Sequence, residues 1–309
     1  MVRSDDFFDD TVNALGSLAG RVCAITGSTS GTGYWAAVAA ARRGASCILL
    51  LNRPSSRASA ALAAIKAEVS KSATVDVIHL DCDLQSFDSV RAAAALAAEE
   101  SAKRGGLDAL LCNAGIMAVP DRRTKDGFDV QMQTNHLSHF LLSKLLMPSL
   151  EAAAAARGEA RVVQHSSGAR KPNKRRPGSD DLVALYFEKV AVGTLGGDGL
   201  GACFGRYHQT KLANTTFAMA LHMKLAAAGS KVKSVCAEPG VASTDLQKNT
   251  ARPHSWLKQR VFGMVGVLMK CSGGHIQSAA DGACSLIVAA FDERTTSGDM
   301  WMPSRHIPV

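Results

Sequence analysis

The sequence predicts a single α/β domain in which a doubly wound parallel sheet carries helices on both faces. Six short apolar runs have the length and composition of buried strands. Alanine-rich stretches between these runs favour helices, because alanine has the highest helix propensity. The expected strands are residues 21–26, 46–51, 75–80, 109–112, 161–165 and 232–237, and the expected helices include 34–43, 89–102, 134–150 and 182–192.

A glycine-rich turn joins the first expected strand to the first expected helix. It reads Thr26-Gly27-Ser28-Thr29-Ser30-Gly31-Thr32-Gly33, with the spacing G-x-x-x-G-x-G rather than the common G-x-G-x-x-G. Glycines allow a tight bend, and the N-terminus of the following helix presents free N–H groups to an anion. Glycine turns are frequent in α/β proteins, but the strand and helix around this one favour binding of a dinucleotide pyrophosphate.

The second strand ends at Asn52-Arg53, where NAD-binding proteins usually place an acidic residue for the adenosine ribose. No acidic residue stands there, and a guanidinium can hold a 2′-phosphate through paired hydrogen bonds. Arg53 as an ordinary solvated loop residue is the alternative interpretation. The pattern favours NADP, as NADPH, over NAD.

Composition excludes several classes of protein. The chain has 309 residues, a formal net charge of +8, and no uninterrupted apolar run of 18 residues, so no transmembrane helix is expected. Acidic residues near the start argue against a signal or transit peptide, which favours a cytoplasmic location, soluble or at a membrane surface. Eight cysteines without a C-x-x-C pair indicate reduced thiols and no metal site.

Tyr207 and Lys211 stand four residues apart, so a helix would place both on one face. A fixed ammonium favours the phenolate, and we therefore expect Lys211 to lower the pKa of Tyr207 toward the range useful for proton transfer. Taken alone, such a pair is more typical of an ordinary helix surface than of a catalytic site.

Together the motifs resemble the short-chain dehydrogenase/reductase family, particularly its retinol-dehydrogenase-like branch, over roughly residues 19–250. That family has a Rossmann-type fold, which agrees with the α/β prediction. The motifs follow the family order: the glycine turn, Asp83-Leu84, Asn113-Ala114-Gly115, Asn135, Ser166-Ser167, Tyr207 with Lys211, and Pro239-Gly240.

The resemblance implies a role for each of these residues. The catalytic set would be Asn135, Ser167, Tyr207 and Lys211, with Tyr207 as acid/base, Ser167 on the carbonyl oxygen, Lys211 on the nicotinamide ribose and Asn135 on a water. Which of Ser166 and Ser167 faces the site stays open. The cofactor would contact Gly27, Ser28, Ser30, Gly31, Thr32, Gly33, Asn52, Arg53, Asp83, Leu84, Asn113, Ala114, Gly115, Tyr207, Lys211, Pro239, Gly240, Val241 and Thr244. His136, His165 and His208 are interpreted as packing or surface residues, and Cys203 as a bystander.

Within the expected catalytic domain, two segments depart from the compact members of the family. Residues 1–18 are expected to be an N-terminal extension of a catalytic domain at 19–309. Within that domain, 168–204 is an insertion beside the site and 245–278 a substrate lid with basic edges around apolar residues. The lid favours an apolar substrate, although an ordinary core helix is the alternative. The basic run at 170–176 and the stretch at 256–270 are compatible with peripheral contact with a membrane, but a solvated charge run explains the basic residues at least as well.

Three functions compete on this basis. The first is an NADP(H)-dependent carbonyl reductase or alcohol dehydrogenase acting on an apolar retinoid-, steroid- or lipid-like substrate. The others are a non-catalytic NADP-binding subunit of a larger assembly and a reductase of a conjugated C=C bond. Nucleic-acid binding is not expected, because aromatic residues make up only 5% of the chain and the basic run lacks stacking partners. The family resemblance allows a homodimer through the outer helices, and the sequence leaves the oligomeric state open.

Overall fold

The computed structural model describes residues 6–69, 74–170, 196–242, 277–303 and 305–308. Seven parallel strands and one antiparallel edge strand form a single sheet in the order β3-β2-β1-β4-β5-β6-β7-β8. The strands are β1 (Val22–Thr26), β2 (Cys47–Asn52), β3 (Asp76–Asp81), β4 (Ala109–Cys112), β5 (Ala160–His165), β6 (Val232–Ala237), β7 (Asp299–Met302) and β8 (Arg305–Pro308). The Rossmann-type α/β prediction is therefore confirmed, and all six expected strands form within about one residue of their expected bounds.

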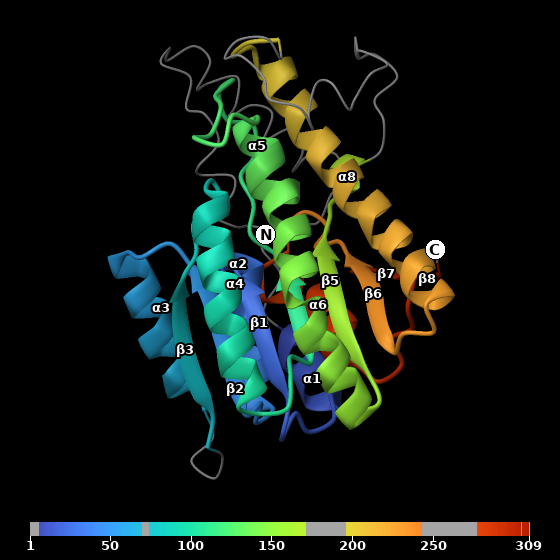
Figure 1. Ribbon diagram of the computed structural model, residues 1–309. Coiled ribbons are helices and arrows are strands. Elements are labelled where there is room, and N and C mark those ends of the chain that lie inside the picture. Colours follow the sequence, from blue (N-terminus) through green and yellow to red (C-terminus); the bar gives the residue numbers. More distant parts are fainter. Residues whose placement is uncertain (1–5, 70–73, 171–195, 243–276, 304, 309) are drawn as a thin grey trace.

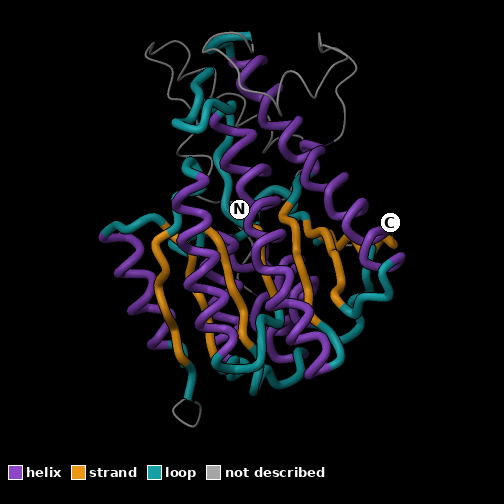
Figure 2. The backbone as a smooth tube through the Cα atoms, viewed as in Figure 1, coloured by secondary structure: helices purple, strands orange, loops and turns teal. Residues whose placement is uncertain are grey.

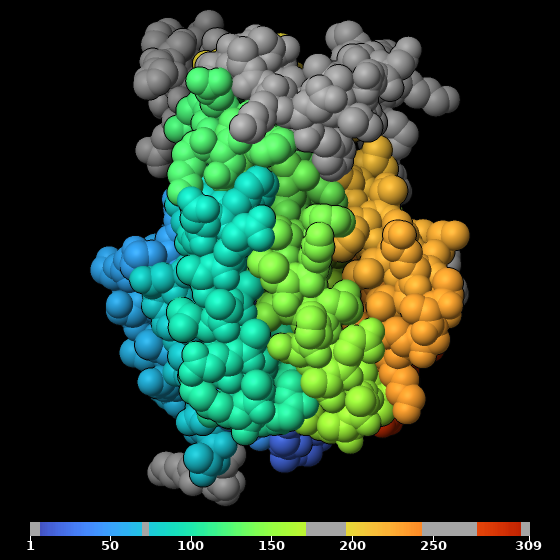
Figure 3. Space-filling model, viewed as in Figure 1, coloured from blue at the N-terminus to red at the C-terminus, as the bar shows by residue number. Residues whose placement is uncertain are grey.

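Helices cover both faces of this sheet (Figure 1). The face toward the viewer carries α4 (Phe87–Ala102), α6 (Ser138–Arg157) and α8 (Leu200–Ala227). The other face carries α1 (Asp6–Ala14), α2 (Gly31–Arg42), α3 (Ser56–Ala67) and α11 (Ala279–Phe291). In the space-filling view, α4, α6 and α8 pack into one closed face (Figure 3).

Alternation along the strands creates two apolar cores, one under each layer of helices. On β1, Ile25 packs toward α2 and α11, whereas Ala24 packs toward α4 and α6. Both side chains are fully buried, which is typical of a parallel strand covered on both faces. Full burial of a side chain such as Ile25 contributes about 1.5–3 kcal/mol, so the central strands form a firm support for the site.

Several elements differ from the sequence prediction. The first expected helix starts earlier, at Gly31, because the glycine turn leads straight into it. The helix expected at 134–150 begins as α5 (Val130–Met132), continues as the π-helical turn η1 (Gln133–Leu137) and only then becomes α6. Strands β7 and β8 were not expected, and the helix expected at 182–192 lies outside the described residues.

The N-terminal segment packs on the domain through α1. Phe8 and Val12, which are four residues apart, are buried against α2 and α11. The backbone N–H of Phe8 also donates to a carboxylate oxygen of Asp281 at 3.0 Å. Residues 6–14 therefore contribute to the same core as the sheet.

Candidate active site

The loops at the carboxyl ends of the parallel strands gather along the upper edge of the sheet (Figure 2). At this edge the β1–α2 turn needs glycine at three positions. Gly27 and Gly31 have φ angles of +70° and +63°, and a Cβ on Gly33 would stand 2.3 Å from Asn113 Nδ2. The helix N-cap Ser30 makes no side-chain capping bond, so the first N–H groups of α2 remain directed at this edge. This cradle fits the pyrophosphate of a dinucleotide.

Asn52 and Arg53 have different surroundings. The Asn52 side chain is buried, accepts a hydrogen bond from the Ser28 backbone N–H at 2.8 Å, and donates to Ser28 Oγ at 2.9 Å. Arg53 is exposed just beyond it. Arg57, on the first turn of α3, donates to Ser30 Oγ at 2.6 Å. Sequence reasoning missed Arg57, although its spacing of four residues from Arg53 was a usable signal.

Asp83 and Leu84 follow β3 at the same edge. One carboxylate oxygen of Asp83 accepts from the Gln85 backbone N–H at 2.9 Å, which fixes the turn after the strand. Leu84 is buried, and its carbonyl accepts from Ser138 Oγ at 2.7 Å. The pair is therefore held in place between β3 and the start of α6.

Asn113, directly after β4, joins the glycine turn to β5. Its Nδ2 donates to the carbonyl of Thr26 at 2.9 Å, and its Oδ1 accepts from Thr32 Oγ1 at 2.8 Å. His165 Nδ1 also lies 2.8 Å from Oδ1. An amide oxygen only accepts, so His165 Nδ1 carries a proton. Burial, together with the charge of Lys211, lowers the pKa of His165 to about 3, and the ring is neutral.

Tyr207 and Lys211 lie on the buried face of α8. Both side chains are at most 5% exposed, and Lys211 Nζ lies 5.8 Å from the centre of the Tyr207 ring. Nζ donates to the His165 carbonyl at 2.8 Å, and Gly115 leaves an open backbone in front of both Nζ and the Asn135 amide. A Cβ on Gly115 would stand 3.3 Å from Asn135 Oδ1 and 3.9 Å from Lys211 Nζ, so a larger side chain there would fill the space in front of both groups.

The pKa values of this pair differ from our expectation. Burial raises the pKa of Tyr207 to about 12, a hydrogen bond with Ser167 lowers it, and the Glu238 carboxylate raises it. Burial likewise lowers the pKa of Lys211 to about 8. The expected lowering of the Tyr207 pKa by Lys211 is absent here, because desolvation of the phenolate outweighs an ammonium directed at a backbone carbonyl.

The structure separates the two neighbouring serines. Ser166 is buried, with its Oγ donating to the Lys211 carbonyl at 2.9 Å and lying 2.8 Å from Thr215 Oγ1. Ser167 Oγ instead accepts from the Ala169 backbone N–H at 3.2 Å, and Ser167 lies close enough to Tyr207 to lower the pKa of the phenol. Ser167 is thus the serine beside the phenol, and Ser166 anchors α8 to β5.

Asn135 sits in the π-helical turn η1 and is fully buried. Its Nδ2 donates to the Ile116 carbonyl at 2.8 Å and to Thr210 Oγ1 at 3.0 Å, and its Oδ1 accepts from the Ile116 backbone N–H at 2.8 Å. The amide therefore ties the loop after β4 to α8. Single π-turns of this kind often occur at functional sites.

The Pro239-Gly240-Val241 loop follows β6. Gly240 has a φ of +68°, and a Cβ there would meet Pro303 Cγ at 2.9 Å, so only glycine fits. Val241 is exposed, while its carbonyl accepts from the Gln277 backbone N–H at 2.9 Å. Thr244 and the expected lid at 245–278 lie outside the described residues, apart from 277 and 278.

Only the two ends of the expected insertion at 168–204 are described. At its start, Arg170 does not face solvent but pairs with Glu238. Near its end, the Gly197 backbone N–H donates to Asp121 Oδ2 at 3.1 Å, and the Asp121 backbone N–H donates to Asp198 Oδ1 at 2.7 Å. The end of the insertion is thus fastened to the loop after β4.

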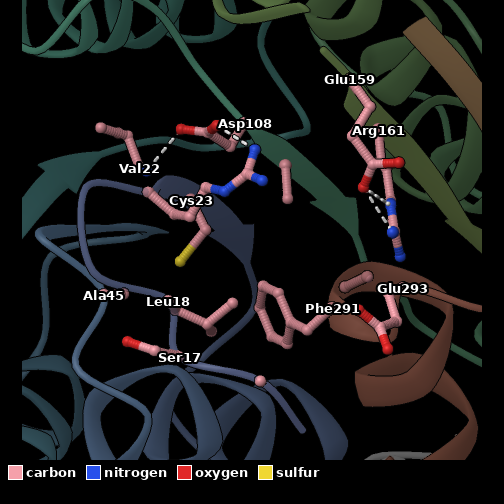
Figure 4. A pocket seen from close by; sticks show the side chains of 14 residues that line it. Ser17, Leu18, Val22, Cys23, Ala45, Asp108, Glu159, Arg161, Phe291 and Glu293 are labelled. Carbon is pink, nitrogen blue, oxygen red and sulfur yellow. Dashed lines mark hydrogen bonds and ion pairs between the residues drawn. The ribbon is translucent and has the colours of Figure 1, made fainter. Parts of the chain in front are cut away.

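A separate cavity of about 150 Å³ lies at the opposite, amino-terminal edge of the strands (Figure 4). Its polar side chains satisfy one another: Asp108 accepts from Arg21 and from the Val22 backbone, and Arg161 pairs with Glu159. The cavity therefore offers a ligand few polar partners, and it is remote from the residues expected to be catalytic.

Three other properties concern only the described part of the chain. Its seven cysteines carry free thiols, as expected. It holds no group of three His, Cys, Asp or Glu side chains suited to a metal ion. None of its helices combines the length and apolar character needed to cross a bilayer.

Comparison with known proteins gives concordant matches. A family model described as short chain dehydrogenase matches residues 21–176. The short-chain dehydrogenase/reductase drtF of Aspergillus calidoustus is 32% identical over 94% of this chain and 87% of its own length. Human polyprenol dehydrogenase is 34% identical over 74% of this chain and 63% of its own length. Human retinol dehydrogenase 13 is 32% identical over 81% of this chain and 67% of its own length.

A solved structure also matches. The crystal structure of an uncharacterised protein from Mycobacterium paratuberculosis superposes with a TM-score of 0.63. It is 30% identical and covers 96% of this chain and 88% of its own.

Proposed function

This chain belongs to the short-chain dehydrogenase/reductase family, in its retinol-dehydrogenase-like branch, and on that premise we propose its reaction. The protein is an NADP(H)-dependent oxidoreductase that moves a hydride between nicotinamide and the carbonyl or alcohol group of an apolar substrate. The observation that carries this proposal is the meeting of Ser167, Tyr207 and Lys211 beside the glycine turn.

The cofactor assignment rests on the upper edge of the sheet. The glycine turn and the N-terminus of α2 would hold the pyrophosphate, with Asn113 keeping the turn in shape. Arg53 and Arg57 both stand where the adenosine ribose would lie, and no carboxylate occurs between residues 46 and 67. Two guanidinium groups without an acidic residue favour a 2′-phosphate, hence NADP.

A bound nicotinamide supplies or accepts the hydride. Tyr207 holds the proton at its hydroxyl, and Ser167, which lowers the pKa of that phenol, lies beside it. With a pKa near 12 the phenol is fully protonated at neutral pH, which suits donation to a carbonyl oxygen and therefore the direction of reduction. Lys211 and Asn135 face Gly115 and would bind the ribose and order a water there.

An apolar substrate is supported by the relatives, whose names include a polyprenol dehydrogenase and a retinol dehydrogenase. We propose a retinoid-, steroid- or lipid-like carbonyl or alcohol. Peripheral membrane contact through 170–176 and 256–270 stays part of this proposal, although Arg170 itself is directed inward. Sedimentation with anionic vesicles would test that contact.

A homodimer through α6 and α8 is also proposed. Phe140 on α6 is 45% exposed and packs against Phe217 of α8, with ring centres 5.2 Å apart, and Met223 on α8 is 62% exposed. Light scattering on the purified protein and on Phe140→Glu would test it, and a wild-type monomer would contradict it.

The decisive experiment measures NADPH consumption against a panel of apolar aldehydes, ketones and enones, with products identified. We expect carbonyl reduction that is lost in Tyr207→Phe by a factor of at least about 10² while NADPH still binds. We also expect NADH to be poorly used, and Arg53→Glu with Arg57→Glu to weaken NADPH binding selectively. Tight NADPH binding without turnover would point to a non-catalytic subunit, and saturated carbonyl products from enones would point to C=C reduction.

A further inference from the structure

An ion pair lies near Tyr207, the candidate acid/base group, and neither of its members is among the expected catalytic residues. Arg170 ends the short helical turn η2 (Gly168–Arg170), which follows Ser167. Its Nη1 pairs with Glu238 Oε2, on the loop after β6. The two side chains are only 15% and 12% exposed. Such a buried pair is costly to desolvate, so it calls for a structural or functional reason.

On one side, the pair holds the turn that carries Ser167. Arg170 Nη1 donates to the Ser167 carbonyl at 3.2 Å, and the Arg170 backbone N–H donates to the same carbonyl at 3.0 Å. The turn passes so close to Glu238 that a Cβ on Gly168 would stand 2.8 Å from Glu238 Oε1. The position of Ser167 therefore depends on the Arg170 guanidinium.

On the other side, the backbone of Glu238 is fixed. Its N–H donates to the Trp301 carbonyl on β7 at 2.8 Å, and its carbonyl accepts from Ser285 Oγ on α11 at 2.7 Å. Pro239 and Gly240 follow directly. The ion pair thus connects the Ser167 turn to the loop expected to contact nicotinamide.

The pair also sets the charge around Tyr207. The Glu238 carboxylate raises the pKa of the phenol, and the guanidinium of Arg170 on η2 is paired with that carboxylate. The other titratable groups nearby are Lys211 and His208 on α8 itself, His165 on β5 and Cys236 on β6. Among the described residues, Glu238 is therefore the carboxylate that acts on Tyr207, and Arg170 is its counter-ion.

We propose that Arg170 and Glu238 are positioning residues whose ion pair holds Ser167 against the Tyr207 hydroxyl and whose charge balance sets the pH range of proton transfer. The inference rests on the proposed function, because it concerns the proton step of that reaction. It predicts that the two single substitutions move the pH profile in opposite directions, which a purely structural salt bridge would not do.

The test compares Glu238→Gln and Arg170→Gln in the direction of alcohol oxidation, where Tyr207 must be deprotonated. Removing the carboxylate favours the phenolate, so Glu238→Gln should move the rising limb of kcat to lower pH by roughly half to one unit. Arg170→Gln leaves the carboxylate unopposed and should move the limb to higher pH by a similar amount. The double variant should return the midpoint to near the wild-type value, with a lower kcat because Ser167 is less well held.

Arg294→Gln is the matched control, because it removes the same charge from a surface ion pair with Asp292. It should leave the profile unchanged. If Arg170→Gln does not fold, Arg170→Lys keeps the charge and should keep the wild-type midpoint while lowering kcat. Wild-type turnover with coincident midpoints in both single variants overturns this inference alone. A wild type without turnover on any alcohol or carbonyl, with NADPH bound, overturns the proposed function and this inference with it.

Discussion

Replacement of Arg206 should reveal how strongly α8, the helix that carries Tyr207 and Lys211, is held to the loop after β4. The Arg206 side chain is 1% exposed, and its guanidinium donates to the carbonyls of Gly197 at 3.0 Å and Val119 at 3.2 Å. It also lies 3.6 Å from Asp129 Oδ2 and 3.8 Å from Asp121 Oδ2. Arg206→Met keeps the length of the chain but leaves two buried carboxylates without this cation.

The magnitude follows from burial and charge. Even beside Arg206, burial raises the pKa of Asp129 from 3.8 to about 6, so its ionisation costs the folded state on the order of 3 kcal/mol above pH 6. That cost disappears as the pH falls from about 6 toward 3.8, where the folded carboxyl is protonated. Without Arg206 the pKa of Asp129 rises further, so the loss of stability must grow with pH.

Urea unfolding at pH 5.5 and pH 8 measures this dependence. We expect Arg206→Met to lower the free energy of unfolding by about 1–2 kcal/mol at pH 5.5 and about 3–5 kcal/mol at pH 8. Asp129→Asn added to Arg206→Met should remove most of the difference between the two pH values. A loss below about 1 kcal/mol at pH 8, or an equal loss at both pH values, would refute this account of the buried cluster.

Three further predictions follow from the site and the core. Gly33→Ala should weaken NADPH binding by at least about tenfold in a fluorescence titration, because its methyl would stand 2.3 Å from Asn113 Nδ2. The control is Gly201→Ala, which has open space around it and should bind NADPH as the wild type does. Equal affinities of Gly33→Ala and the wild type would refute the close fit. Ser167→Ala should lower kcat by about 10- to 100-fold with little loss of stability. Ser166→Ala should instead lower the free energy of unfolding by about 1 kcal/mol and leave kcat largely intact. The reverse pattern would exchange the roles of the two serines. Burial raises the pKa values of the Cys82 and Cys112 thiols to about 12. The buried thiols should therefore react with a thiol reagent much faster in urea than in buffer. Fast labelling of these thiols in the native protein would contradict their burial.

The sequence was sufficient for the parts of the fold that carry continuous apolar runs. Four of these strands, β1, β2, β4 and β5, consist entirely of buried residues, and β6 departs from this only at Lys233. The β3 strand, at the edge of the sheet, buries only Val77 and Leu80, but its apolar residues still predict a strand. The β7 strand has only four residues, beginning with Asp299, and it forms because Met300 and Trp301 pair with β6. Its existence depends on a neighbour rather than on its own composition, so local reasoning missed it.

The same distinction applies to the site. Tyr207, Lys211 and the glycine turn could be located because each motif consists of residues that are close together in the sequence. The Arg170–Glu238 pair joins residues 68 positions apart, and Arg170 looked like part of a solvated basic run. The resulting pKa of Tyr207 could not be predicted either, because desolvation depends on everything that packs around the ring.

The cofactor cradle and the acid/base pair are parts of one hydrogen-bonded unit. Thr32, at the start of α2, donates to Asn113, which accepts from His165, whose carbonyl in turn accepts from Lys211 Nζ. Thr32, His165 and Lys211 are buried and Asn113 is half-buried, so a shift of the glycine turn would be passed to Lys211 through closely packed groups. Because the His165 ring is neutral, it connects Asn113 to β5 without adding a charge beside the Lys211 ammonium. A substitution at His165, which touches neither the pyrophosphate cradle nor the Tyr207 hydroxyl directly, should therefore disturb cofactor affinity and proton transfer together.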